Sequence, residues 1–157
     1  MLAQVWGVFK PKGKSLAMGH AQTILIADPN PYVRSFLSRE LGAAGYQTVV
    51  AGAWKEILAC LNGEAPPALV ILELDFPVDI GINVLQRIQR FSSPVPQIIY
   101  THLTEYEHHP DVAKATAFIE KNDDPDRLFQ AIAEVMDRHS VNRHGSFIGS
   151  QPMTGKE

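Results

Sequence analysis

Two hydrophobic periods alternate along residues 22–139. Apolar residues recur three or four positions apart in several segments, as on one side of a helix, and Val33, Phe36, Leu37 and Leu41 form the first such stripe. Between these segments lie short, compact apolar runs that suit strands buried on both faces, at residues 23–28, 46–50, 69–74, 97–101 and 117–121. The pattern predicts five strands that alternate with helices.

Local signals mark where the helices begin and end. Asn30 and Pro31 combine a capping side chain with a proline at the first helical position, and Gly45 supplies the stop. Pro110 breaks the polar segment 102–116, so we expect only a short helix there. Strands joined in this way by helices favour an α/β fold, with a parallel sheet covered on both faces.

Composition indicates one globular domain. The chain has 157 residues, 45% of them hydrophobic, and the periodic pattern predicts a folded unit at residues 22–139. We expect residues 140–157, which are polar and rich in glycine, to form a flexible tail. Residues 1–21 are expected to be an arm, or an extension upstream of a natural start at Met18.

Charge and cysteine content limit the possible partners and setting. The formal net charge is only −3, which argues against nucleic acid or an anionic membrane surface as a general partner. The apolar stretch near the N-terminus is too short to span a bilayer, and its lysines follow rather than precede it, unlike a secretory signal. Cys60 is the single cysteine, so no internal disulfide forms and a cytoplasmic location is expected.

Four polar residues stand where predicted strands end. In an open parallel sheet, functional groups collect beyond the carboxyl ends of the strands, and those ends hold Asp28, Glu73, Thr101 and Lys121. Two acids, a hydroxyl and an ammonium suit a divalent cation and a phosphoryl group. Any one of these residues is explained simply by a polar side chain leaving the core, but the four together indicate a site.

Two stretches resemble a known family. "ILIADPNPYVRSFLSRELGAAGYQTVVA" and "PPALVILELDFPVDIGINVLQRI" are similar to the receiver domain of bacterial two-component response regulators. The similarity covers nearly all of residues 22–138, with Pro77 and Gly81 fixing the register. The resemblance implies a flavodoxin-like five-stranded parallel sheet of order 2-1-3-4-5. In active members of the family it also implies an aspartate that accepts a phosphoryl group with Mg²⁺.

The resemblance fails at the residues that perform this reaction. Asp28 matches the first of two acidic residues in the family, but the second position holds Pro29, and the acceptor aspartate falls on Glu73. Thr101 and Lys121 match the hydroxyl residue and the lysine of the family pattern.

Three neighbouring positions also depart from the family. His102 stands where a small residue is usual, so we expect it to crowd access to the pocket. Asn122 replaces the proline that usually follows the lysine. The aromatic switch position falls on Phe118, which has no hydroxyl, and the preceding helix is expected to be shortened.

These departures predict loss of phosphotransfer. Pro29 removes one metal ligand, leaving Asp28 and Glu73 as weak Mg²⁺ ligands at best, so we expect no required cofactor and no catalytic residue. The extra methylene of Glu73 displaces the nucleophilic oxygens, and a misplacement of about 1 Å can cost on the order of 10²-fold. Residual reaction at Glu73, or at Asp75 as a substitute acceptor, remains open.

The resulting hypothesis is a stand-alone, phosphorylation-independent pseudo-receiver, not an enzyme, in which Glu73 is a permanent anion beside Lys121. The resemblance implies a protein partner (histidine kinase, scaffold or output protein) or a homodimer formed through the last two helices and the fifth strand. The alternative is a functional phospho-receiver that accepts a phosphoryl group from a histidine kinase with Mg²⁺.

Two further readings are weaker. His102, Glu105, His108 and His109 are all of metal-ligand type, but their spacing matches no closed zinc pattern, which favours a solvated loop. A flavin site lacks a phosphate-binding glycine or Ser/Thr-rich loop after the first strand.

Overall fold

A computed structural model describes residues 22–77, 81–90, 95–122 and 124–144 of the chain. The predicted arm at 1–21, and the predicted tail beyond residue 144, lie outside the described residues. The strands are β1 (Thr23–Ala27), β2 (Gln47–Ala51), β3 (Leu69–Leu72), β4 (Gln97–Thr101) and β5 (Ala117–Glu120). The helices are α1 (Pro31–Ala43), α2 (Trp54–Leu61), α3 (Gly81–Gln89), α4 (Pro110–Ala113) and α5 (Asp126–His144), with a 3-10 turn, η1 (Thr104–Tyr106).

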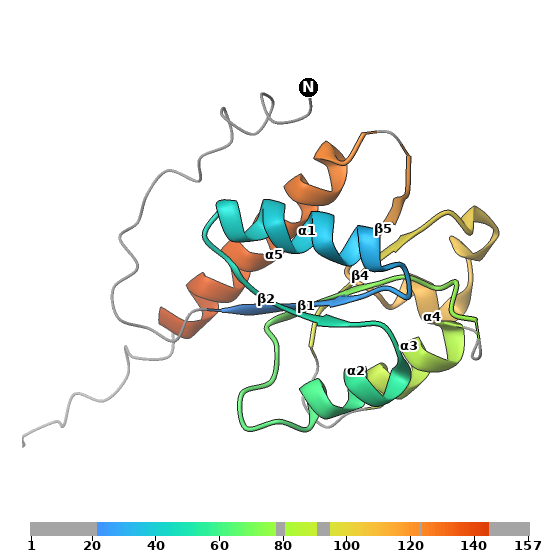
Figure 1. Ribbon diagram of the computed structural model, residues 1–157, viewed down its shortest axis with the longest axis horizontal. Helices are drawn as coiled ribbons and strands as arrows, with labels where there is room; N and C mark the ends of the chain where they lie inside the picture. The colour runs from blue at the N-terminus through green and yellow to red at the C-terminus, as the bar shows by residue number, and fades with distance from the viewer. Residues whose placement is uncertain (1–21, 78–80, 91–94, 123, 145–157) are drawn as a thin grey trace, which may run out of the picture.

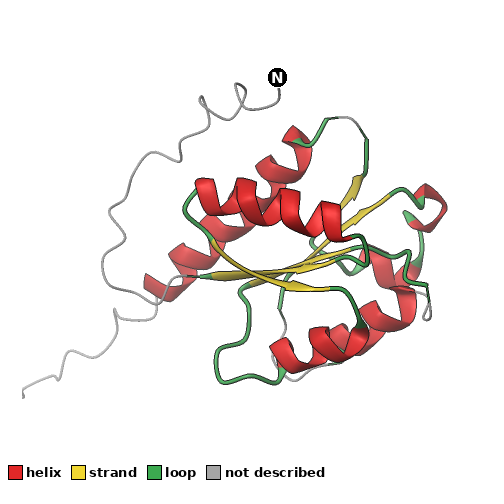
Figure 2. Cartoon of the chain, viewed as in Figure 1, coloured by secondary structure: helices red, strands yellow, loops and turns green. Residues whose placement is uncertain are grey.

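The five strands form one parallel sheet of order β2-β1-β3-β4-β5, as the sequence and its resemblance predict. Helices α1 and α5 lie on one face of the sheet, while α2, α3 and α4 lie on the other (Figure 1). Figure 2 shows the strands as the middle layer between these two groups of helices. This is the flavodoxin-like architecture, and it aligns the carboxyl ends of all five strands along one edge.

The sheet divides the hydrophobic core into two layers. Leu37 and Leu41 of α1 pack with Leu128 and Ile132 of α5 against one face. The second layer packs α2, α3 and α4 against the other face and contains Ile57, Leu85 and Val112. Strand β3 is buried throughout because it contacts both layers, which explains why its sequence shows no polar alternation.

The signals at the ends of α1 act as predicted. The Asn30 side chain accepts a hydrogen bond from the Tyr32 N–H at 2.9 Å, and Pro31 occupies the first helical position. Gly45 has a φ of +93°, a conformation that favours glycine, and it reverses the chain toward β2. The Tyr46 N–H donates to the Leu41 carbonyl, so β2 begins at Gln47, one residue later than predicted, and extends to Ala51.

Other boundaries also differ from expectation, and β1 and β5 each end one residue earlier than predicted, at Ala27 and Glu120. β3 ends at Leu72, so Glu73 and Leu74 lie beyond the strand that was predicted to include them. α5 continues to His144, five positions past the predicted end of the folded unit at His139. Residues 137–142 are mostly polar and exposed, and the Ser140 hydroxyl donates to the Met136 carbonyl. A helix can continue by local hydrogen bonding without an apolar stripe, which the hydrophobic pattern does not detect.

The segment between β4 and β5 contains the short helix that Pro110 predicted. Pro110 starts α4, the His109 Nδ1 accepts from the Asp111 N–H at 3.2 Å, and the helix ends at Ala113. Helix α3 holds it in place, because the Gln86 side chain donates to Asp111 Oδ2 at 2.7 Å and the Gln89 side chain donates to the Asp111 carbonyl at 2.9 Å. No helix among the described residues is long and apolar enough to cross a membrane.

Candidate functional site at the carboxyl ends of the strands

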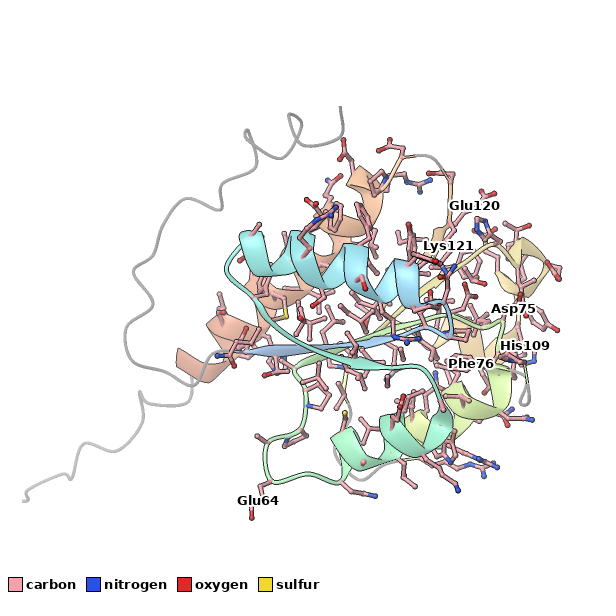
Figure 3. The ribbon with its side chains drawn as sticks, viewed as in Figure 1. Glu64, Asp75, Phe76, His109, Glu120 and Lys121 are labelled. Atoms are coloured by element: carbon pink, nitrogen blue, oxygen red, sulfur yellow. The ribbon has the colours of Figure 1, made fainter. Side chains whose placement is uncertain are left out.

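The four residues predicted from the strand ends lie together in one pocket. Asp28 follows β1, Glu73 follows β3, Thr101 ends β4 and Lys121 follows β5, and these four strands are neighbours in the sheet. Their exposed fractions are 3%, 5%, 0% and 9%, so all four polar side chains are buried. Figure 3 shows Lys121 and Asp75 at this end of the sheet, on the opposite side of the molecule from Glu64.

Backbone bonds fix the two chain segments that follow the strands. The Glu73 N–H donates to the Ala27 carbonyl at 2.9 Å, and the Lys121 N–H donates to the Thr101 carbonyl at 2.8 Å. Each bond continues the ladder one residue past its strand. The side chains of Glu73 and Lys121 are therefore positioned by the sheet rather than by an independent loop.

Lys121 bridges the two acids. Its Nζ lies 2.6 Å from Asp28 Oδ2 and also donates to Glu73 Oε2. Nζ also lies 5.4 Å from the centre of the Tyr100 ring. One ammonium group thus serves two carboxyl groups in a buried setting, where ion pairing without further hydrogen bonds does not offset the cost of removing charges from water.

Further hydrogen bonds supply this compensation at Glu73. Its Oε1 accepts the Thr101 hydroxyl, the Leu74 N–H at 2.7 Å and the Asp75 N–H at 3.0 Å. Its Oε2 accepts from Lys121. Both oxygens of Glu73 therefore have donors within the chain.

Asp28 is also bonded at both oxygens. Oδ1 accepts the Asn30 N–H at 2.8 Å, while Oδ2 pairs with Lys121. The Asp28 N–H donates to the Ala51 carbonyl at 3.0 Å, which ties the loop after β1 to the end of β2.

Arg34 is a contributor that the sequence reasoning missed. Its Nη1 donates to the Asp28 carbonyl at 2.8 Å and to the Pro29 carbonyl at 3.1 Å, so the guanidinium holds the loop after β1 from the side of α1. Gly52 makes room for it, because a Cβ there would lie 2.7 Å from Arg34 Nη1. The only sequence signal is a basic residue one turn into α1, which is too common to be noticed.

Electrostatics favour the charged form of both members of the Glu73–Lys121 pair. Burial raises the pKa of Glu73, but hydrogen bonds from Lys121, Thr101 and the Asp75 N–H outweigh it, and the net pKa is lowered. Burial lowers the pKa of Lys121, but its bonds to Asp28 and Glu73 outweigh that effect, and the net pKa is raised. The pocket therefore holds an ionised Glu73–Lys121 pair at neutral pH.

Asp75, His102 and Asn122 follow the pocket residues Glu73, Thr101 and Lys121 in the chain by one or two positions. The side chains of Asp75 and His102 are exposed, and Asp75 contributes its backbone N–H to Glu73. Asn122 is exposed and accepts the Asp124 N–H at 2.9 Å, in the turn before α5. Phe118 is half-buried against the core layer beneath α2 and α3. Restricted access through His102 remains a prediction.

The histidine-rich segment does not assemble a metal site in this structure. His102, Glu105 and His108 are exposed, and His109 caps α4 instead. In the part of the chain that the structure describes, no three His, Cys, Asp or Glu side chains converge as a metal site would require. The segment includes the turn η1, which the sequence reasoning treated as loop.

Comparison with known proteins identifies the family. A family model described as the response regulator receiver domain matches residues 24–133. The chain belongs to this family. It is 27% identical over 154 residues to the DNA-binding response regulator MtrA of Mycolicibacterium smegmatis, an alignment that covers 84% of this chain and 67% of MtrA.

Solved receiver structures share the fold. The response regulator TrrA of Thermotoga maritima, determined in complex with Mg²⁺-BeF, is 25% identical with a TM-score of 0.66, over 73% of this chain and 98% of TrrA. A CheY-like receiver domain protein of Methanospirillum hungatei superimposes with a TM-score of 0.70 at 22% identity, over 78% of this chain and 98% of its own. The chain is therefore a receiver domain of two-component signalling, with the fold predicted for it.

Proposed function

We propose that this receiver domain acts without phosphorylation, as a protein-binding module in two-component signalling and not as an enzyme. The observation that carries the proposal is the state of Glu73, at the family's acceptor position. Its carboxylate is buried, ionised and bonded at both oxygens by groups of the same chain. A nucleophile in that state must lose existing bonds before it can attack.

The groups that match the family's hydroxyl and lysine are already engaged. Thr101 donates its hydroxyl to Glu73 Oε1, and Lys121 donates to Glu73 Oε2 and Asp28 Oδ2. In active members of the family, a hydroxyl residue and a lysine stand at these two positions beside the aspartate that accepts the phosphoryl group. Here the acceptor's own carboxylate occupies both of them, so an incoming phosphoryl group competes with a covalently attached anion that is always present.

The described residues fit a Mg²⁺ ion poorly. Asp28 and Glu73 are the carboxylates that would hold it, and Pro29 offers neither a carboxylate nor a backbone donor at the position of the second acidic residue. Both Asp28 oxygens are engaged, one by Asn30 and one by Lys121. A metal would have to displace the Lys121 ammonium from this acid, so we propose that the domain needs no metal.

The fixed Glu73 anion supports a single conformation of the pocket. It carries about one negative charge, compared with about −1.5 to −2 for a phosphorylated side chain, and so it is a partial mimic of that state. We propose that a protein partner (histidine kinase, scaffold or output protein) or a second copy binds through α4, β5 and α5. The histidine kinase ThkA has been determined in complex with TrrA, which supports a kinase as one candidate. The lone Cys60 supports a cytoplasmic setting.

A phosphorylation assay tests the proposal. The chain is incubated with acetyl phosphate and Mg²⁺, and its intact mass is measured, with TrrA as the assay control. We expect no phosphoryl adduct on this chain. A stoichiometric adduct at Glu73 or Asp75 would instead establish the alternative, a functional phospho-receiver.

A double variant provides the matched positive control. Pro29→Asp with Glu73→Asp restores the second acidic residue and the shorter acceptor of the family pattern. We expect this variant to form a phosphoryl adduct under the same conditions. Aspartate at position 73 is one methylene shorter than glutamate, which restores the position of the nucleophilic oxygens, and aspartate at position 29 gives Mg²⁺ a second carboxylate ligand.

A further inference from the structure

The outer strand β2 has one side without a strand partner in the described structure. β2 pairs with β1 and stands at the end of the sheet order. Figure 1 shows it at the sheet edge, with α1 on one face and α2 on the other. We propose that an extended, acidic segment of a partner protein binds here as an additional strand.

The backbone of β2 presents hydrogen-bonding groups on this open side. The Ala51 carbonyl accepts the Asp28 N–H, so Ala51 directs its backbone groups toward β1. Because these groups alternate along a strand, Thr48 and Val50 direct their N–H and carbonyl groups outward. A peptide in strand conformation can bond to these groups without disturbing the β1–β2 ladder.

The side chains of β2 do not protect the edge. Segment 46–51 contains no charged residue and no proline, the two features with which proteins commonly block an exposed edge. Val49 and Val50 are 41% and 45% exposed, large fractions for valines in a sheet. The other outer strand, β5, ends in an exposed glutamate, Glu120. β2 is therefore the edge better suited to strand addition.

A groove beside β2 indicates the chemistry of the partner. Its cavity of about 500 Å³ lies between α1 and the strand and is lined by Pro31, Arg34, Ser35, Ser38, Arg39 and Val50. Two of these residues are cationic and none is acidic. Among the described residues, Arg34 donates to the carbonyls of Asp28 and Pro29, which carry no formal charge and so do not neutralise the guanidinium. Arg39 pairs with Glu40, but at an exposed position where such a pair is weak.

The charges of this chain's own terminal segments, and of a second copy, do not complement the basic groove. Residues 1–21 contain three lysines and no acidic residue, and residues 145–157 contain one lysine and one glutamate. A second copy would bring the same basic groove rather than a complementary one. The best match is a strand whose side chains on the α1 side are Asp or Glu, with apolar side chains alternating toward Val49. This inference is independent of whether Glu73 accepts a phosphoryl group.

A peptide titration of the full chain tests the inference. The probe is a synthetic peptide with blocked ends, GTVEVDVEVG, and its matched controls replace the acids with lysine or methylate alternate backbone nitrogens. Binding is followed by amide chemical shifts in ¹⁵N-labelled protein. We expect saturable shifts at Thr48 and Val50, and affinities at least tenfold weaker for both control peptides.

Variants separate the backbone from the charge contribution. Val50→Pro removes one outward N–H and should weaken the acidic peptide at least tenfold, while Val50→Thr keeps the N–H and should bind as the parent does. Arg39→Glu should also weaken binding of the acidic peptide at least tenfold. If circular dichroism shows that Val50→Pro is unfolded, Arg39→Glu tests the charge contribution and the methylated peptide tests the backbone contribution.

Three outcomes would overturn the inference. The first is equal binding of the acidic and lysine peptides, and the second is the absence of saturable binding by the acidic peptide. The third is a concentration-dependent shift of the Thr48 and Val50 amides without peptide, accompanied by dimers in sedimentation, which would assign the edge to a second copy.

Discussion

Lys121 is the residue on which the buried pocket depends most. Its ammonium contacts both Asp28 and Glu73, and each acid uses one of its oxygens for that contact. The remaining donors to the two acids are backbone N–H groups and the Thr101 hydroxyl, none of which has a formal charge. Removing Lys121 therefore leaves two buried carboxyl groups to which no other cation of the described residues is bonded.

We expect Lys121→Met to lower the free energy of unfolding by about 3–5 kcal/mol, the usual cost of breaking a buried ion pair on one side. Urea denaturation at neutral pH measures it. Lys114→Met is the matched control, because Lys114 pairs with Asp111 at 2.9 Å while its side chain is 65% exposed, and such a pair contributes about 1 kcal/mol or less. Equal effects of the two substitutions would show that the pocket does not depend on the ion pair.

The lowered pKa of Glu73 predicts acid sensitivity. A carboxyl group whose pKa is lower in the folded state stabilises the fold above its unfolded value, about 4.3, and that stability is lost as the pH falls through the lower folded value. Glu73→Gln should therefore flatten this part of the curve of unfolding free energy against pH. Urea titrations from pH 7 to strongly acidic pH measure it, and an unchanged slope would contradict the assignment.

The raised pKa of Lys121 affects the opposite end of the pH range. A lysine with a raised folded pKa stabilises the fold below its unfolded value, about 10.4, and that stability is lost as the pH rises through the folded value. Between these limits the pair is ionised. Stability conferred by the pocket should consequently be nearly constant across neutral pH.

Sequence reasoning found the residues of the pocket but not their bonding. Asp28, Glu73, Thr101 and Lys121 were identified because residues at the carboxyl ends of parallel strands must share an edge. Donation to both oxygens of Glu73 depends on rotamers and on the loop at Leu74 and Asp75, which hydrophobic periodicity does not specify. Arg34 was missed because its contacts are with backbone carbonyls, whose directions no residue type encodes.

At the scale of elements, the start of α3 depends on a glycine. Gly81 is buried at the first position of α3, and its N–H donates to the Leu74 carbonyl at 2.8 Å. A Cβ on Gly81 would overlap the backbone of Leu74, at its Cα, carbonyl carbon and oxygen. Through this close approach, the start of α3 packs against the segment that follows Glu73.

We expect Gly81→Ala to destabilise the domain by about 1–3 kcal/mol, the range for overpacking that moves backbone. Gly42→Ala in α1 is the matched control, because nothing lies within 4 Å of its added Cβ and alanine favours a helix by about 0.5–1 kcal/mol. Thermal unfolding of both variants compares them. The two substitutions should have opposite signs, and stabilisation by Gly81→Ala would contradict the close approach.

Element boundaries show where periodicity stops being informative. β4 was predicted to the residue, because its apolar run is bounded by polar residues and a proline. β3 was predicted too long, because Leu74 is apolar and buried yet lies in the loop after the strand. α5 extends past the predicted end of the folded unit at residue 139, because residues 137–142 are mostly polar and exposed and carry no apolar stripe. The errors occur where burial and secondary structure do not coincide.

At the scale of the whole molecule, the alternation of strand and helix periods along the chain predicted the parallel α/β architecture. The strand order was predicted only by the family resemblance. Periodicity shows which residues are buried but not which strands are neighbours. The two core layers on either side of the sheet then leave its carboxyl edge as the place where buried polar groups meet. Its four acidic, hydroxyl and ammonium side chains belong to four separate segments of the chain.

A ligand-stabilisation experiment examines this edge in the intact domain. A ligand that binds only the folded state stabilises it by about 2.7 kcal/mol at 100 times its dissociation constant. Because Lys121 and Asn30 already engage Asp28, we expect Mg²⁺ with beryllofluoride to leave the thermal midpoint of this chain unchanged. The Pro29→Asp, Glu73→Asp variant should gain stability from the same addition. A raised midpoint for the parent chain would contradict the proposal that no metal is needed.

The bonds from Thr101 and Lys121 to Glu73 have a consequence for the timing of signals. A phosphoryl group arrives and is hydrolysed, so its contacts have a lifetime and record a recent event. The Glu73 side chain is synthesised with the chain and is present in every copy for as long as that copy exists. Under the proposed function, a partner therefore responds to how many copies are present and where they are located, rather than to the fraction recently modified. Control of such a protein then lies in its synthesis, degradation and placement.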